Sequence, residues 1–264
     1  MNSKICQFDQ PLEILYQDQY LVAINKPADL LVHRSPIDRH EHQFALQMVR
    51  DQIGQYVWPL HRLDKPTSGV LVFGLSAEVA SMMGQRFREN ATEHQLEKKY
   101  LAIVRGWVQQ QKLDAADSKG WIEIDHPFAD KADSIADKDK SQPAEVKPAL
   151  SFYRSLAQGT LEAEIDRYPQ SRFSLLEIAP KTGRKHQIRR HLKHIAQPII
   201  GDANYGKGNY NRWFAENLAV DRLLLHCQMM AFDHPITGER LEITAGLDER
   251  FTKALAGLNI KIPN

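Results

Sequence analysis

The 264-residue chain has little of what a membrane or secreted protein needs. It contains no apolar run near the roughly 20 residues of a membrane-spanning helix. Its first ten residues, MNSKICQFDQ, lack the apolar stretch of a secretory signal. Hydrophobic residues still make up 42% of the chain, enough to fill a sizeable core. We therefore expect a globular protein of the cytoplasm, without a membrane partner.

Cysteine is also scarce, because Cys6 and Cys227 are the only two in the chain. Cys227 lies within the apolar run LLLHCQMMAF, where a buried free thiol is the ordinary interpretation. We expect neither a disulfide nor a cysteine metal site.

Net charge is nearly absent, at +1, yet the charges are strongly segregated. Residues 181–195 contain six Lys or Arg and three His but no acid, whereas residues 113–145 contain nine acids against four lysines. Binding of an anionic polymer depends on such local fields and not on the total charge. The pattern favours a basic face for RNA or DNA, and the alternative is an ordinary solvated helix face.

The hydrophobic pattern alternates between short β-type runs and amphipathic stretches, which predicts an α/β or α+β sheet protein. Expected strands lie at 12–16, 20–27, 70–75, 100–104, 150–153, 161–165, 173–178 and 223–232, and expected helices at 41–54, 76–96 and 185–196.

Residues 113–148 show little periodicity and contain Pro143 and Pro148, so we interpret them as a mobile loop excursion. Core-like patterns occur on both sides of this stretch. We therefore expect one domain over residues 1–264 with an insertion, and we find no internal repeat.

Residues 61–69, HRLDKPTSG, place Asp64 two positions after Arg62 in a turn imposed by Pro66 and Gly69. In an extended stretch both side chains would project to one face. A buried aspartate needs a nearby cation to remain ionised, and Arg62 and Arg189 are the candidates. The alternative is a buried pair that simply caps the turn.

Residues 182–192, TGRKHQIRRHL, form a second cationic block. Ile188, Leu192 and Ile195 recur at helical spacing and predict a short amphipathic helix, with Arg189 among the residues off the apolar stripe. Thr182 or Gly183 is the expected start. Exposed N–H groups there add positive charge to the block. We expect the phosphate contacts to come from Lys181, Arg184, Lys185, His186, Gln187 and Arg190.

Histidines on this block raise the alternative of a metal-dependent hydrolase. His186, His191 and His194 have no acidic neighbour in the sequence, and such histidines are more often hydrogen-bonding residues. We expect no metal site. Tyr100, which follows two lysines, is the type of side chain that stacks on an unstacked base, although most strand tyrosines only pack.

Taken together, the motifs resemble those of the RluA family of pseudouridine synthases, most closely its bacterial branch C, which modifies tRNA. The matching blocks, which span nearly the whole chain, are NKP at 25–27, LVHRS at 31–35, HRLDKPTSGVL at 61–71, KKYLAIVRG at 98–106, PKTGRKHQIRRHL at 180–192, PIIGD at 198–202 and RLLLH at 222–226.

This resemblance implies an α+β fold with a mixed, mostly antiparallel central sheet flanked by helices and loops. It makes Asp64 the catalytic aspartate and Arg189 its ion-pair partner. Arg62 would help displace the target base, and Tyr100 would stack on it. The resemblance also places Leu225, His226 and Lys26 at the pocket.

Two departures from the family pattern stand out. Relatives usually have glycine where this chain has Asp29, so the backbone freedom of glycine is missing there. Many relatives that act on ribosomal RNA begin with an S4-type RNA-binding module, whereas this chain starts directly at the catalytic core. This favours a small structured substrate such as tRNA.

The implied reaction breaks the C1′–N1 bond of a uridine, turns the base and rejoins it through C5, without a cofactor. One carboxylate suffices because the detached base is itself the final nucleophile. The expected target is the uridine that this branch numbers 65, in the acceptor-proximal stem of tRNA, and we expect a monomer. The alternatives are a synthase for 23S ribosomal RNA or another tRNA site, and a non-catalytic RNA-binding module.

Overall fold

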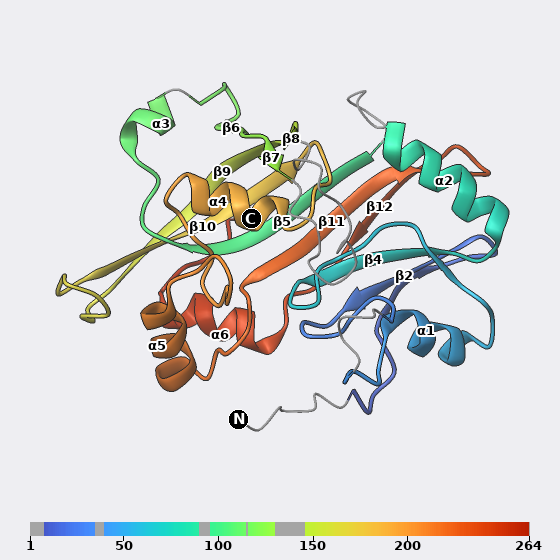
Figure 1. Cartoon of the computed structure of the whole chain (residues 1–264), viewed down its shortest axis with the longest axis horizontal. Coiled ribbons are helices and arrows are strands. Elements are labelled where there is room, and N and C mark those ends of the chain that lie inside the picture. The colour runs from blue at the N-terminus through green and yellow to red at the C-terminus, as the bar shows by residue number, and fades with distance from the viewer. Residues whose placement is uncertain (1–7, 35–39, 90–95, 115, 130–145, 264) are drawn as a thin grey trace, which may run out of the picture.

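The computed structural model describes residues 8–34, 40–89, 96–114, 116–129 and 146–263. Within them a ten-stranded sheet runs in the order β1-β2-β4-β11-β5-β10-β9-β6, with β12 added to β11 and β3 to β4 (Figure 1). The β4–β11 pair is parallel, and the other pairs of the described strands are antiparallel. The expected mixed, mostly antiparallel sheet is thus confirmed.

The strands are β1 (Ile14–Gln17), β2 (Leu21–Lys26), β3 (Trp58–Pro59), β4 (Ser68–Gly74), β5 (Leu96–Arg105), β6 (Ile122–Asp125), β7 (Phe128–Ala129), β8 (Val146–Lys147), β9 (Leu150–Leu161), β10 (Ser171–Pro180), β11 (Leu225–Asp233) and β12 (Arg240–Thr244). The helices are α1 (Ala45–Ile53), α2 (Ala77–Glu89), α3 (Gln110–Asp114), α4 (Gln187–His194), α5 (Gly208–Leu218) and α6 (Glu249–Gly257).

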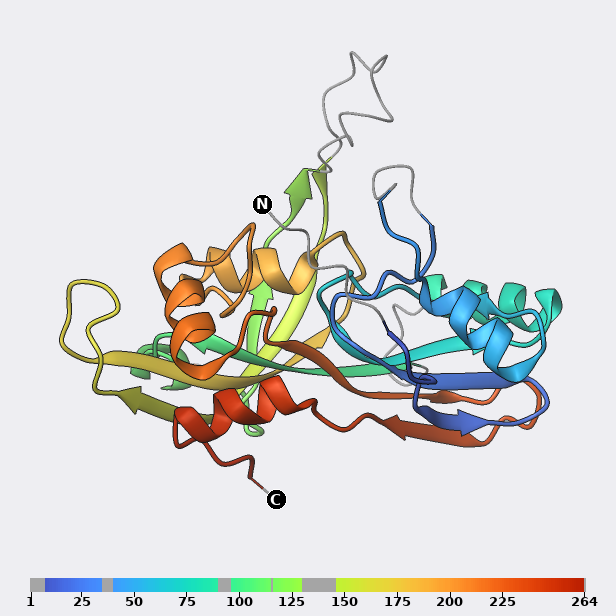
Figure 2. The same ribbon diagram turned by 90° about the horizontal axis from the view of Figure 1, so that it is seen from below.

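The middle of the sheet forms the core, because helices cover it on both faces. Helices α1, α2 and α4 lie on one face and α6 lies on the other (Figure 2). Every residue of β4 is buried, which explains why the sequence GVLVFG after Ser68 is an unbroken apolar run and does not alternate. Among the described residues, every helix is too short or too polar to cross a lipid bilayer.

Gly69 allows β4 and β11 to lie side by side at the point where the 61–67 loop enters the sheet. Its φ is +112°, and a Cβ atom at this position would collide with the backbone of Cys227. Any other residue would push the two strands apart. Asp29, which replaces the glycine usual in the family, keeps the left-handed conformation at φ 68°. Aspartate is one of the few residues that tolerate it.

Parts of the sequence interpretation are wrong. The mobile loop expected over 113–148 includes β6, which pairs with β9, and β7 and β8, which pair with each other. The buried–exposed alternation of β6 is only four residues long, too short to stand out among the surrounding acidic residues. Residues 130–145 lie outside the described residues, as does Cys6.

Strand boundaries also differ from expectation. The strand expected at 150–153 continues to Leu161 as β9, and the separate strand expected at 161–165 is wrong because residues 162–165 are not in a strand. Helices α5 and α6 and strand β12 were not expected at all. A short amphipathic element whose apolar face depends on a distant partner has little local signal.

Candidate active site

A cleft of about 570 Å³ opens between the two cationic blocks. Residues 59–64 form one wall and Pro180 with residues 182–189 forms the other, while Tyr100 of β5 and Leu225 of β11 contribute from the sheet. The antiparallel pairing of β5 with both β10 and β11 brings these distant segments together.

Asp64 lies in the turn that precedes β4, where the Thr67 amide donates to the Asp64 carbonyl at 3.0 Å. Its side chain is 26% exposed and faces Arg189, whose Nη1 donates to Asp64 Oδ2 at 3.2 Å. The structure therefore brings Asp64 to Arg189, whereas Arg62, which also lines the cleft, is exposed. The contact places the guanidinium cation of Arg189 directly beside the Asp64 carboxylate.

Arg189 is held in place by Asp202, which the sequence reasoning did not single out. Arg189 Nε and Nη2 donate to the two carboxylate oxygens of Asp202 at 2.7 and 2.8 Å. Burial opposes both charges, but the pairing outweighs it, raising the pKa of Arg189 and lowering that of Asp202. The planar guanidinium can serve both aspartates because its donors point in fixed directions. The only sequence signal was the aspartate that ends PIIGD.

The second block is less helical than expected, because α4 begins at Gln187 and not at Thr182 or Gly183. The buried Gln187 amide explains the late start. Its Oε1 accepts from the Thr182 hydroxyl and the Arg184 amide, and its Nε2 donates to Ser151 Oγ. Gln187 is thus a structural anchor that also lines the cleft.

The buried face of α4 is broader than the predicted apolar stripe, because it also includes Arg189, which is only 4% exposed. Asp202 and Tyr205 contact Arg189 on this side of the helix, Asp202 through an ion pair and Tyr205 with its ring 5.2 Å from the guanidinium. Helical periodicity placed Arg189 on the exposed side of the helix, but its ion pair with Asp202 allows it to be buried.

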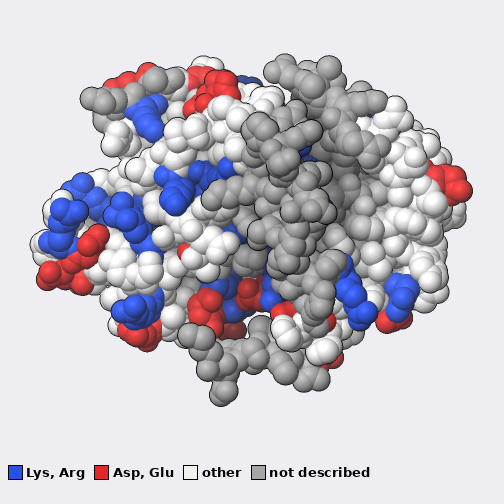
Figure 3. Space-filling view, viewed as in Figure 1, with Lys and Arg blue, Asp and Glu red and all other residues white. Residues whose placement is uncertain are grey.

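The remaining predicted RNA contacts lie at different places. Arg184, Lys185 and His186 line the cleft, whereas Lys181 and Arg190 do not. Arg190 lies 3.8 Å above the ring of Phe128, and Figure 3 shows Lys and Arg side chains in several groups on this side of the molecule. The basic face that the charge segregation predicts stays a prediction.

Tyr100 is buried on β5, in register with Cys227 of β11, and lines the cleft. Burial, together with the Cys227 thiol, raises its pKa well above the ordinary value, so the phenol stays protonated at neutral pH. Lys98, two residues earlier, lines the same wall, and burial lowers its pKa. The cleft thus offers an aromatic ring beside a cation. The stacking role of Tyr100 remains a prediction.

Two residues expected at the pocket lie beneath it. Lys26 is fully buried, and its Nζ donates to the carbonyls of Pro27, Leu30 and Lys65 at 2.8, 2.8 and 3.1 Å. Burial, followed by repulsion from an arginine, lowers its pKa to about 7. The hydrogen bond from Lys26 to the Lys65 carbonyl fixes the backbone of the residue that follows Asp64.

His226 is also buried, with Nδ1 2.8 Å from Ser68 Oγ and Nε2 3.1 Å from the Ala245 carbonyl. Burial lowers its pKa to about 4, so the ring is neutral at neutral pH. Because the carbonyl needs a donor, Nε2 carries the proton and Nδ1 accepts from the Ser68 hydroxyl. The ring therefore supports the start of β4 and does not line the cleft.

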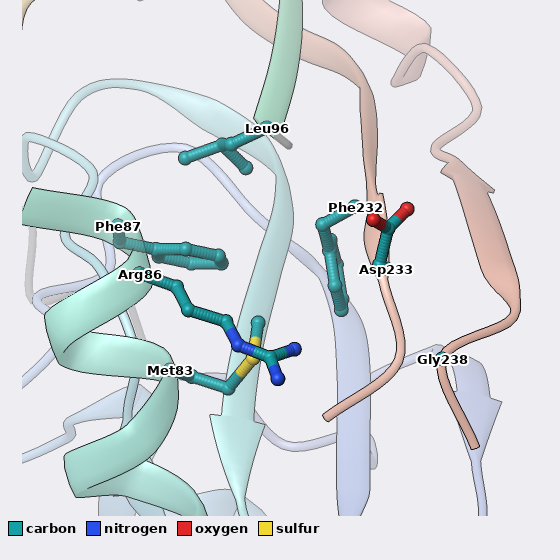
Figure 4. Close-up of a pocket in the computed structure, with 7 residues that line it drawn as sticks. All are labelled: Met83, Arg86, Phe87, Leu96, Phe232, Asp233 and Gly238. Atoms are coloured by element: carbon teal, nitrogen blue, oxygen red, sulfur yellow. The ribbon is translucent and has the colours of Figure 1, made fainter. Parts of the chain in front are cut away.

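A smaller hollow of about 230 Å³ lies between α2 and the end of β11 (Figure 4). Phe87 and Phe232 face each other across it. None of the predicted site residues lines it. In the described part of the chain, no group of three or more His, Cys, Asp or Glu side chains is arranged to hold a metal ion.

Comparison with known proteins agrees with the motifs. Residues 20–194 match the family model described as RNA pseudouridylate synthase. The chain is 48% identical to tRNA pseudouridine synthase C of Vibrio cholerae over 238 residues, covering 90% of this chain and 92% of the relative. It is 48% identical to the protein of the same name from Salmonella typhimurium over 244 residues, covering 92% and 88%.

Among solved structures, human RNA pseudouridylate synthase domain containing 4 superposes with a TM-score of 0.66 at 26% identity, covering 96% of this chain and 95% of that one. The family model matches more than half of the chain, and the sequence identity to these relatives extends over about nine tenths of both chains. The chain therefore belongs to the RNA pseudouridylate synthase family, of the RluA type that its sequence motifs predicted.

Proposed function

We propose that this chain isomerises a uridine of tRNA to pseudouridine, with Asp64 as the catalytic carboxylate. One observation carries the proposal. Among the described residues that line the large cleft, Asp64 is the sole carboxylate, and it faces Arg189. The names of the relatives in V. cholerae and S. typhimurium support tRNA as the substrate.

In the reaction the C1′–N1 bond breaks, the uracil turns, and a C1′–C5 bond forms. The proton on C5 leaves to solvent and N1 gains one, so the product is an isomer of the substrate. Attack of Asp64 on C1′, attack on the base and removal of a sugar proton all use an ionised carboxylate. Arg189 supplies the counter-charge in each case.

The target uridine has to leave its base stack, at a cost of a few kcal/mol that other contacts must offset. Arg62, which is exposed and lines the cleft, would fill the gap, and Tyr100, which also lines it, would stack on the uracil. Basic side chains between Lys181 and Arg190 would hold the phosphates. The proposed target is the acceptor-proximal stem uridine, position 65, modified in the cytoplasm by a monomer without a cofactor.

The test is tritium release from tRNA labelled at C5 of uridine, with purified protein in EDTA, followed by mapping of the modified position. Release that maps to the acceptor-proximal stem supports the proposal. Release from ribosomal RNA but not tRNA would keep the chemistry and overturn the substrate. No tritium release from either tRNA or ribosomal RNA, together with tight RNA binding, would favour the non-catalytic RNA-binding module.

A further inference from the structure

His186 has an unusual backbone conformation for its position. It is the N-cap residue of α4, with φ 53° and ψ 27°, in the left-handed region that costs a non-glycine residue free energy. N-cap side chains normally accept a hydrogen bond from the first turn, but the His186 side chain makes no capping bond. The conformation therefore does not serve to cap the helix.

The left-handed conformation instead places the imidazole between two polar groups. Its Nδ1 lies 3.1 Å from the hydroxyl of Tyr205, and the two rings meet edge to face at 5.7 Å. Its Nε2 lies 3.9 Å from Asp64 Oδ2. This is slightly too long for a hydrogen bond, but catalytic contacts often tighten when substrate binds. The Tyr205 contact holds the ring so that Nε2 faces the carboxylate.

Burial favours the neutral form of the His186 ring. Burial disfavours the imidazolium first, and Arg189 and Lys185 repel it. Asp64 and Asp202 act in the opposite direction, but the net effect lowers the pKa of His186. A neutral imidazole has one N–H group, and a lone pair on Nε2 would repel the carboxylate. Nε2 therefore carries the proton, and Nδ1 accepts from the Tyr205 hydroxyl.

Both contacts of the Asp64 carboxylate fall on the same oxygen. Arg189 Nη1 lies 3.2 Å and His186 Nε2 lies 3.9 Å from Oδ2. We propose that His186 is a positioning residue that, together with Arg189, holds Oδ2 of Asp64 through a neutral N–H donor and leaves Oδ1 to react with the uridine. The proposal rests on the proposed function of Asp64. It assigns His186 to the carboxylate and not to an RNA phosphate.

Protonation of His186 should inhibit the reaction. The imidazolium would form a full ion pair with Asp64 and compete with the uridine for the carboxylate. Because the pKa of His186 is lowered, this inhibition appears only below the ordinary histidine value of about 6.5 and is absent at neutral pH.

The experiment measures single-turnover tritium release from C5-labelled tRNA between about pH 5 and about pH 8, and tRNA affinity alongside it. Three variants separate the possible roles. In His186→Gln the amide keeps a neutral N–H donor but cannot titrate, whereas His186→Ala removes the donor. His194→Gln is the matched control, because it makes the same change on the same helix at a residue that does not line the cleft.

We expect His186→Ala to lower the turnover rate by about a hundredfold at neutral pH, as misplacement of a reacting group does. We expect His186→Gln to keep most of the rate and to lose the acidic decline of the wild-type profile. All variants should bind tRNA within a few-fold of wild type, and His194→Gln should keep the wild-type profile.

Three outcomes would overturn the inference. In the first, His186→Ala weakens tRNA binding without changing the turnover rate, which would make His186 a phosphate contact. In the second, His186→Gln is as inactive as His186→Ala although folded. In the third, His186→Gln keeps the acidic decline. An inactive wild-type protein would instead refute the proposed function.

Discussion

Two buried arginines of this protein make similar contacts but have different roles. Arg189 is 4% exposed and Arg222 is 1% exposed, and each pairs with an aspartate. Arg189 directs two donors to Asp202 and the third into the cleft, toward Asp64. Arg222 is enclosed by protein acceptors.

The acceptors of Arg222 show its structural role. Its guanidinium donates to the carbonyls of Leu223 and Leu225, to Ser68 Oγ and to Asp248, the N-cap residue of α6. Burial outweighs these partners and lowers its pKa, whereas that of Arg189 is raised. The comparison teaches that burial alone does not mark a functional arginine. The difference is that one donor of Arg189 reaches a carboxylate that lines the large cleft, whereas Asp248, the aspartate that Arg222 contacts, does not line it.

The most severe test of this comparison is Asp64→Asn, which removes the carboxylate that Arg189 contacts in the cleft. We expect tritium release from tRNA to be abolished and tRNA affinity to stay within a few-fold, because the amide keeps the shape of the side chain. Retained turnover would refute the assignment of Asp64. So would lost binding in a folded protein.

A second test replaces each arginine by lysine, which keeps the charge but loses the planar fork. We expect Arg189→Lys to lower turnover by about a hundredfold, because one ammonium cannot orient toward both aspartates. Arg222→Lys should lower the free energy of unfolding by about 2–4 kcal/mol through lost hydrogen bonds, with near-normal turnover per folded molecule. Urea unfolding and single-turnover rates measure the two effects. If both variants lost turnover and stability to the same extent, the distinction between a functional and a structural arginine would be refuted.

A third test addresses the support of Arg189. We expect Asp202→Asn to lower the free energy of unfolding at neutral pH by about 1–3 kcal/mol. The folded-state pKa of Asp202 is lowered, so its contribution is present above the unfolded value of about 3.9 and is lost as pH falls further. Urea unfolding at several pH values should show the two proteins converging below about pH 4. A constant difference would mean that the charge of Asp202 contributes nothing.

The smallest expected effect concerns the basic face outside the two ion pairs. Lys185→Ala should weaken tRNA binding and reduce the salt slope of the binding constant by about one, because one phosphate contact is lost. Lys253→Ala is the control, because that lysine pairs with Glu249 on α6 and does not line the cleft. An unchanged slope in Lys185→Ala would remove Lys185 from the phosphate contacts.

Much of the fold and part of the site can be predicted from the amino-acid sequence. Long periodic runs predicted β2, β4, β5, β10 and β11 within a few residues, because an extended buried run needs no distant partner to be recognised. The resemblance in the motifs predicted the family and the contact of Asp64 with Arg189. Short elements such as β6 and α6 were missed because tertiary packing, not local pattern, stabilises them.

The sequence by itself determined the family and the type of reaction and predicted one carboxylate for it, because these depend on residue types at fixed spacings. Only the tertiary structure decided that Asp202 orients Arg189, that Lys26 and His226 lie beneath the cleft, and that His186 faces Asp64. The physical reason is that these contacts join segments far apart in the chain. Local periodicity contains no information about which of them fold against one another.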